Sequence, residues 1–149
     1  MISLNFDGNK DKLEQTLKYF SSAEGATEVN KGDKLEKIEG NIYAIYVDGK
    51  IKYIGERQSG KIAYRLNQHF FSCPPGTSSK LSKVTEAFDQ NKKVAYKTLL
   101  VVPDYERYSV ETYLIQNIAG LDWNIRDKKH EIEISGTDEI SIIVDSSDN

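Results

Sequence analysis

Residues 41–55 have the sequence NIYAIYVDGKIKYIG, which predicts a β-hairpin. Ile42–Val47 is an uninterrupted apolar run, and 50–54 forms a second short strand pattern. The Asp48-Gly49 pair between them accepts the positive backbone angles that a tight turn requires. This hairpin is therefore the first element of the predicted core, and the neighbouring segments can be placed around it.

The segments that follow the hairpin alternate between helical and strand patterns. Apolar residues at helical spacing predict helices over 61–71, 79–91 and 105–119. Between the second and third of these, Val94–Val102 is rich in β-branched residues and predicts a strand. The order β-β-α-α-β-α indicates an α+β fold with a small three-stranded antiparallel sheet flanked by helices.

The two ends of the chain have their own patterns. At the start, 2–6 predicts a strand and 9–20 a helix, followed by a loop over 21–34. At the other end, two alternating stretches around 135–138 predict a C-terminal β-hairpin. We therefore divide the chain into an N-terminal extension, a core, and an acidic C-terminal hairpin and tail: 1–39, 40–124 and 125–149.

Composition excludes several classes of protein. The 149 residues fit one domain, and 38% hydrophobic with 29% charged residues is typical of a globular protein rather than a disordered one. The single cysteine, Cys73, excludes an intrachain disulfide and a multi-cysteine zinc site, and it suits a reducing compartment, so we expect a cytoplasmic protein. No apolar run approaches the roughly 18 residues of a membrane span, and the start has no signal-peptide pattern.

Charge is distributed unevenly along the chain. The net charge is −3, yet 50–97 carries ten basic residues against three acidic ones, while 125–149 carries a net −4. A polyanion such as nucleic acid would bind at the basic stretch. The alternative is a solvated helical surface on which lysines serve solubility.

Six elements in a fixed order resemble the GIY-YIG nuclease superfamily. They are Asn41-Ile42-Tyr43, Tyr53-Ile54-Gly55, Arg65, His69, Glu111 and Asn124. Asn41 replaces the first of the two naming glycines, and the second tripeptide is intact. The resemblance spans 40–124, over half the chain. It implies a nuclease fold that cuts DNA with Mg2+, for which Mn2+ can substitute.

Phosphodiester hydrolysis explains why these residue types would be needed. Glu111 is the carboxylate that we expect to bind the metal ion, because Mg2+ prefers hard oxygen ligands. Arg65 and His69 lie four residues apart, hence on one helix face. The Arg65 guanidinium suits the scissile phosphate, and His69 can titrate near neutrality as a general base or can bind phosphate. The alternatives are an ordinary surface Glu111 beside Arg107, and an Arg-His pair exposed without function.

The two tyrosines are the remaining catalytic candidates. The resemblance implies that Tyr43 and Tyr53 act as general base or position the attacking water. A phenol titrates near pH 10, so a base would need its pKa lowered by Arg65, Lys61 or the metal ion. The alternative is that both tyrosines are cross-strand packing residues.

The register of the hairpin tests a joint role for the tyrosines. A two-residue turn pairs Val47 with Lys50 and puts Tyr43 and Tyr53 on opposite faces. A type I turn with a bulge at Gly49 places Tyr43 directly across from Tyr53. Because a shared active site needs one face, we predict the bulged turn, although the two-residue turn is commoner.

Several further residues are candidates for binding substrate. Arg57, Lys61, Lys80 and Lys83 belong to the basic stretch. Asn124 could orient backbone near the site, touch phosphate, or only form a turn. Glu56, straight after the second tripeptide, would repel phosphate, and Arg57 beside it would compensate.

These observations predict a small stand-alone endonuclease of restriction or phage type that cuts double-stranded DNA. A homodimer or homotetramer would place two active sites on two strands. The main alternative is a catalytically silent relative that binds nucleic acid or protein. A third interpretation, a DNA-mimicking inhibitor, conflicts with the basic stretch.

Overall fold

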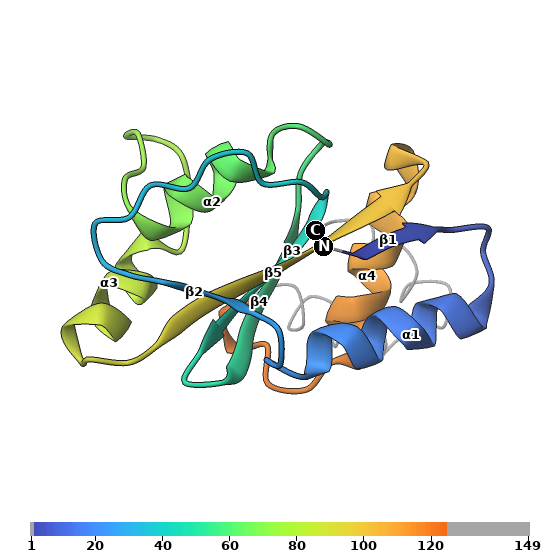
Figure 1. The fold of residues 1–149 in the computed structure, drawn as a ribbon, viewed down its shortest axis with the longest axis horizontal. Helices are drawn as coiled ribbons and strands as arrows, with labels where there is room; N and C mark the ends of the chain where they lie inside the picture. Colours follow the sequence, from blue (N-terminus) through green and yellow to red (C-terminus); the bar gives the residue numbers. More distant parts are fainter. Residues whose placement is uncertain (1, 125–149) are drawn as a thin grey trace, which may run out of the picture.

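The structure is a computed structural model that describes residues 2–124, in which one mixed five-stranded sheet lies between two layers of helices (Figure 1). The strands are β1 (Ile2–Asn5), β2 (Thr27–Val29), β3 (Ile42–Val47), β4 (Lys50–Glu56) and β5 (Val94–Val102). The helices are α1 (Lys10–Ser21), α2 (Ile62–Phe70), α3 (Leu81–Asp89) and α4 (Arg107–Asn117), with 3-10 helices η1 (Asp104–Glu106) and η2 (Asp122–Asn124).

The sheet is larger than the three strands that we predicted. Its centre is the expected antiparallel set, in the order β5-β3-β4. The outer edge of β5 pairs with two more strands, β1 in parallel and β2 antiparallel. β5 is nine residues long, so one edge accommodates both. The predicted three-stranded sheet is therefore corrected to a mixed sheet of five strands.

β2 lies in a segment that we expected to be a loop. It has only three residues, and two of them are exposed, so no apolar alternation marks it in the sequence. Together with β1 it joins residues of the N-terminal extension to the same sheet as the core. The predicted C-terminal hairpin lies outside the described residues.

The helices cover the two faces of the sheet in pairs. Figure 1 shows α2 and α3 on one side and α1 and α4 on the other. Along β3, Ile42, Ala44 and Tyr46 belong to the cluster on the α1/α4 side, and the alternate residues belong to the α2/α3 side. All six residues of β3 are buried, which explains its uninterrupted apolar sequence.

The hairpin has a different turn from the one that we predicted. Val47 pairs with Lys50 across a two-residue turn, in which Asp48 and Gly49 have φ values of +50° and +78°. The bulged turn is therefore wrong. An extra residue at Lys52 then shifts the register between Ile45 and Tyr46.

The bulge at Lys52 puts Tyr43 and Tyr53 on the same face of the sheet. Beyond it, Tyr43 pairs with Gly55 and Ile45 pairs with Tyr53. Gly55 and Tyr53 are two residues apart, hence on the same face, so Tyr43 and Tyr53 lie diagonally on one face. The expected proximity of the tyrosines is thus produced by a bulge within β4 and not by the turn.

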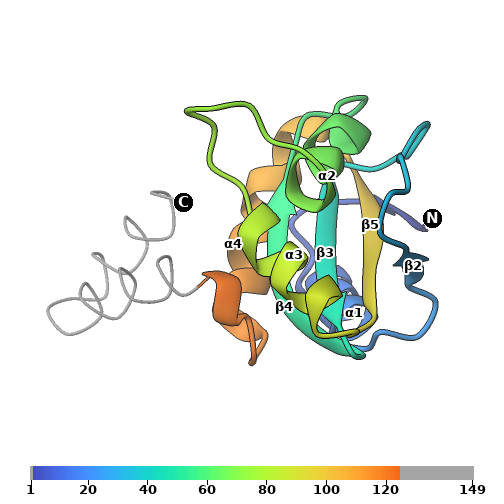
Figure 2. The same ribbon diagram turned by 90° about the vertical axis from the view of Figure 1, so that its left-hand side faces the viewer.

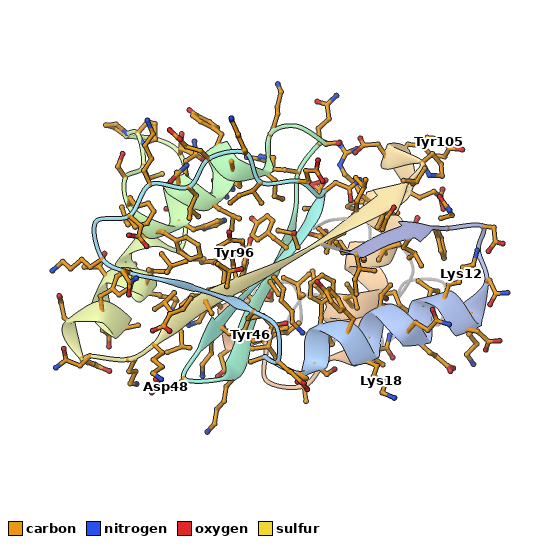
Figure 3. All side chains as sticks on the ribbon, in the orientation of Figure 1. Lys12, Lys18, Tyr46, Asp48, Tyr96 and Tyr105 are labelled. Atoms are coloured by element: carbon orange, nitrogen blue, oxygen red, sulfur yellow. The ribbon has the colours of Figure 1, made fainter. Side chains whose placement is uncertain are left out.

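The N-terminal helix is bonded to the sheet through buried polar groups. The Tyr46 hydroxyl donates to the Phe20 carbonyl at 2.6 Å, near the end of α1 (Figure 3). Lys97 of β5 donates to the carbonyls of Tyr19 and Ser22 at 2.7 and 2.6 Å. These bonds satisfy carbonyls that the end of a helix leaves without an intrahelical partner.

Over residues 2–124, none of the helices combines the length and the apolar character needed to cross a membrane.

Candidate active site

The face of the hairpin that points toward α2 and α3 carries both tyrosines. The ring centres of Tyr43 and Tyr53 are 6.1 Å apart. Opposite Tyr43, a side chain on Gly55 would collide with the Tyr43 ring and its hydroxyl group. Glycine is therefore required at position 55 so that the Tyr43 ring can lie across the strand.

His69 completes an aromatic cluster with the two tyrosines. It lies on α2, and its ring centre is 5.5 Å from that of Tyr43 and 5.4 Å from that of Tyr53. The Nε2 atom of His69 is 2.8 Å from the Tyr43 hydroxyl oxygen, and the Lys80 backbone N–H donates to Nδ1 at 2.9 Å. Because Nδ1 accepts, the hydrogen of the neutral ring is on Nε2, and His69 donates to Tyr43.

The surroundings of His69 keep it neutral. Burial, together with the positive charges of Arg65, Lys80 and Arg57, lowers the pKa of His69 to about 3. Our expectation that His69 titrates near neutrality is therefore wrong. With Nδ1 accepting from Lys80 and Nε2 carrying its hydrogen, His69 is a hydrogen-bond donor that holds the Tyr43 hydroxyl.

The Tyr43 hydroxyl lies between opposing electrostatic influences. Burial raises the pKa of Tyr43 well above its usual value, and the proximity of Tyr53 raises it further. Arg65 acts in the opposite direction through its charge and a hydrogen bond, while the Glu111 carboxylate raises the pKa again. A Tyr43 phenolate therefore needs positive charge beyond that of Arg65.

Arg65 is held in place from two directions. Its Nη1 donates to Gln68 Oε1 at 2.7 Å and to the Ser78 carbonyl at 2.8 Å. The first partner belongs to α2 and the second to the connection between α2 and α3. The guanidinium is thus fixed beside Tyr43, where its planar fork of N–H groups can bind the oxygens of a phosphoryl group.

Glu111 lies near Tyr43 but comes from the helical layer on the other side of the sheet. It lies on α4, which packs against β4, and its side chain is 8% exposed. Because Glu111 is buried, it is not the ordinary surface residue of the alternative interpretation. Arg107, four residues before it, donates to Glu56 at 2.8 Å and to Asp104. Arg107 also neutralises Glu56, which we had expected to repel phosphate.

The Glu111 carboxylate fits the chemistry of a magnesium ion. Carboxylate oxygen is a hard ligand, and Mg2+ keeps several waters when it binds through one or two carboxylates and a substrate phosphate. Residues 2–124 contain no group of three or more His, Cys, Asp or Glu side chains arranged to hold a metal ion. Glu111 is close enough to Tyr43 for its charge to act on the phenol, and its carboxylate would hold such an ion there.

The predicted substrate-binding residues separate into three groups. Arg57 and Lys80 lie close enough to His69 to lower its pKa, and the Lys80 ammonium is 5.2 Å from the centre of the Tyr53 ring. Lys61 is exposed at the start of α2. Lys83 lines a different groove, farther along α3.

Asn124 has a role other than binding substrate. Its Oδ1 accepts from the Ile54 N–H at 2.9 Å, and its Nδ2 donates to the Ile54 carbonyl at 3.0 Å. The side chain is only 3% exposed, so a phosphate cannot reach it. The predicted substrate contact is corrected: Asn124 pairs with the outer edge of β4 and fixes the strand between Tyr53 and Gly55.

Asn41 is a structural residue whose function we did not foresee. Its side chain accepts from the Val101 N–H at 2.8 Å, and it donates to the Val101 carbonyl and to Asp104, each at 2.9 Å. The amide thus imitates a backbone group and extends the pairing of β3 with β5. An asparagine in place of the family's glycine therefore leaves Tyr43 in position.

Comparisons of the chain with protein-family models, with curated proteins and with solved structures find no match. The resemblance to the GIY-YIG nucleases therefore rests on the residues described above.

Proposed function

We propose that this protein is a metal-dependent endonuclease of the GIY-YIG type that hydrolyses phosphodiester bonds of double-stranded DNA. One observation carries the proposal: five side chains from four elements meet around the Tyr43 hydroxyl. They are Tyr43, Tyr53, Arg65, His69 and Glu111. Structural packing alone does not require an arginine, a buried glutamate and a histidine beside one phenol.

Each residue has a chemical task in the proposed reaction. The Tyr43 oxygen, as the phenolate that Arg65 and a bound metal ion would together favour, positions the attacking water and accepts its proton, while the His69 N–H holds that oxygen in place. Arg65 binds the phosphoryl oxygens and neutralises the charge that grows on them. The oxygen–phosphorus bond to water forms as the bond to the leaving 3′ oxygen breaks, and that oxygen takes up a proton from solvent water. Glu111 would hold Mg2+ or Mn2+, which supplies Lewis acidity and lowers the pKa of bound water.

The partner and assembly follow from the same proposal. Ten basic residues against three acidic ones over 50–97 favour a polyanionic substrate. A small domain that cuts both strands needs two sites, so we propose a homodimer or homotetramer of restriction or phage type. A cytoplasmic location suits both DNA cleavage and the single cysteine.

Cleavage of supercoiled plasmid tests this function. We expect the wild type to cut with Mg2+ or Mn2+ and not with EDTA. Glu111→Gln should lower the rate by about a thousandfold or more, because a bound metal supplies several kcal/mol of transition-state stabilisation. Glu14→Gln, on the exposed surface of α1, is the matched control and should cut like the wild type.

The second candidate function is a catalytically silent module that binds nucleic acid. The full burial of Tyr43, which raises its pKa, favours this alternative because it opposes a phenolate base. A wild type that binds duplex DNA but leaves both plasmid and varied genomic DNA intact with either metal would support the silent module and refute the endonuclease.

A further inference from the structure

A second basic site lies along α3, beyond the candidate active site. It is a groove of about 200 Å³ between α3, β4 and η2. Its charged and aromatic lining residues are Lys52, Lys83, Glu86, Lys92 and Trp123. Figure 2 shows α3 in front of the sheet, with β4 and the η2 segment beside it. The catalytic cluster is the proposed set Tyr43, Tyr53, Arg65, His69 and Glu111. None of Lys52, Lys92 and Trp123 belongs to it.

The groove continues from the catalytic cluster along two neighbouring elements. On α3, Lys80 stands over Tyr53, and Lys83 follows one helical turn later. On β4, Tyr53 faces the cluster and the adjacent Lys52 lines the groove. From Lys80 to Ala87, which also lines the groove, the helix rises about 10 Å, or roughly three nucleotide steps of a DNA strand.

The charge of the groove is predominantly positive. Lys52 forms an ion pair with Asp122 at 3.3 Å. Residues 2–124 provide no carboxylate within ion-pair distance of Lys83 or Lys92, although Glu86 lines the same groove. Two ammonium groups thus line a common space in which Glu86 is the only carboxylate among the described lining residues, and it is not within ion-pair distance of either.

Trp123 gives the groove a rigid apolar wall. It packs against the α2/α3 hydrophobic cluster, and the neighbouring Asn124 is bonded to the Ile54 backbone. A fixed wall limits the directions in which the flexible lysine side chains can extend. The groove therefore offers both charge and shape to a chain of phosphates and sugars.

We propose that this groove binds the phosphate backbone of the DNA strand about three nucleotides from the scissile phosphate. The inference rests on the proposed function, because it places the scissile phosphate at Arg65 and Tyr43. It adds a second contact that sets the direction in which the strand leaves the active site. Phosphate contacts of this kind fix the register of a protein on DNA without reading its sequence.

The salt dependence of DNA binding tests the groove. The double variant Lys83→Gln/Lys92→Gln removes two of the three lining lysines without adding bulk, and it keeps Lys52, which is paired with Asp122. Lys10→Gln/Lys18→Gln is the matched control, because it removes the same charge from exposed positions on α1. Figure 3 labels Lys18 on this helix. Binding of a short duplex oligonucleotide is measured in EDTA, so that cleavage does not interfere.

We expect the groove variant to lower the slope of log affinity against log salt by between about one and two, since each phosphate contact contributes about 0.9. The control should keep the wild-type slope. Equal slopes for the groove variant and the control would refute the groove, even for a wild type that cuts DNA. A wild type that binds with the expected slopes but never cuts would refute only the endonuclease. Absence of binding at every salt concentration from about 50 to 200 mM would refute both.

Discussion

Two tyrosines of one strand, Tyr43 and Tyr46, show how the two faces of the sheet differ. Both are buried, and they lie on opposite faces of β3. The Tyr46 hydroxyl donates to a backbone carbonyl, that of Phe20. The Tyr43 hydroxyl accepts from the side chain of His69 and lies beside Arg65 and Glu111. Burial raises the pKa of both phenols. The titratable neighbours of Tyr46 are Tyr19 and Lys97, which bond to backbone carbonyls, whereas His69 bonds to the Tyr43 hydroxyl itself.

The same difference holds for other buried polar side chains. Lys97, Asn124 and Thr16 bond to backbone carbonyl or N–H groups, which is what a folded core needs. Around Tyr43, side chains bond to one another: His69 to Tyr43, and Arg65 to Gln68. His69 and Arg65 also bond to backbone groups, so the difference lies in the bonds between side chains. Bonding to the backbone alone indicates a structural role, whereas a network of charged and titratable side chains indicates chemistry.

The largest expected effect is on activity. Tyr43→Phe removes the oxygen that we assign to the attacking water, and it should lower the plasmid cleavage rate by about a hundredfold to ten-thousandfold. Tyr46→Phe removes the same atom from the other face and should leave the rate within a few-fold of the wild type. If both variants cut at similar rates, the two faces do not differ in function.

The second prediction concerns acid stability on the α2/α3 face. The pKa of His69 is about 3 in the folded protein and 6.5 as the reference value. The unfolded chain therefore binds a proton that the folded protein excludes as pH falls below 6.5. This stabilisation is complete above pH 6.5 and is lost as pH falls toward 3. Unfolding free energy should decrease by about 2 kcal/mol from pH 7 to pH 5 on account of His69.

Urea unfolding at a series of pH values between 7 and 5 measures this effect. Ordinary carboxyl groups titrate mainly below this window, so histidines dominate it. His69→Gln should flatten the dependence, while His130→Gln, the only other histidine, should retain it. A wild type with the same pH dependence as His69→Gln would show that position 69 does not exclude a proton on folding.

The sequence predicts the elements of this fold better than their contacts. Helices α2 and α4 follow from apolar spacing, and their inward residues Leu66 and Leu114 are buried. The bulge at Lys52 has no glycine or other marker, so the register could not be predicted. The roles of His69 and Asn124 depend on backbone groups of Lys80 and Ile54, which only tertiary packing brings to them.

The smallest expected effect is on the stability of the α1/α4 face. Tyr46→Phe leaves the Phe20 carbonyl buried without its hydroxyl donor, and such a loss costs about 1–2 kcal/mol of unfolding free energy. For a chain of this length the melting temperature should fall by about 3–8 °C. Tyr19→Phe, which removes a hydroxyl bonded to the Thr98 carbonyl from a partly exposed ring, is the matched comparison. It should cost less, because water can reach the carbonyl that it leaves. An equal loss in both variants would mean that burial does not set the strength of these two hydrogen bonds. Burial is the property that the hydroxyl bond of Tyr46 shares with that of Tyr43.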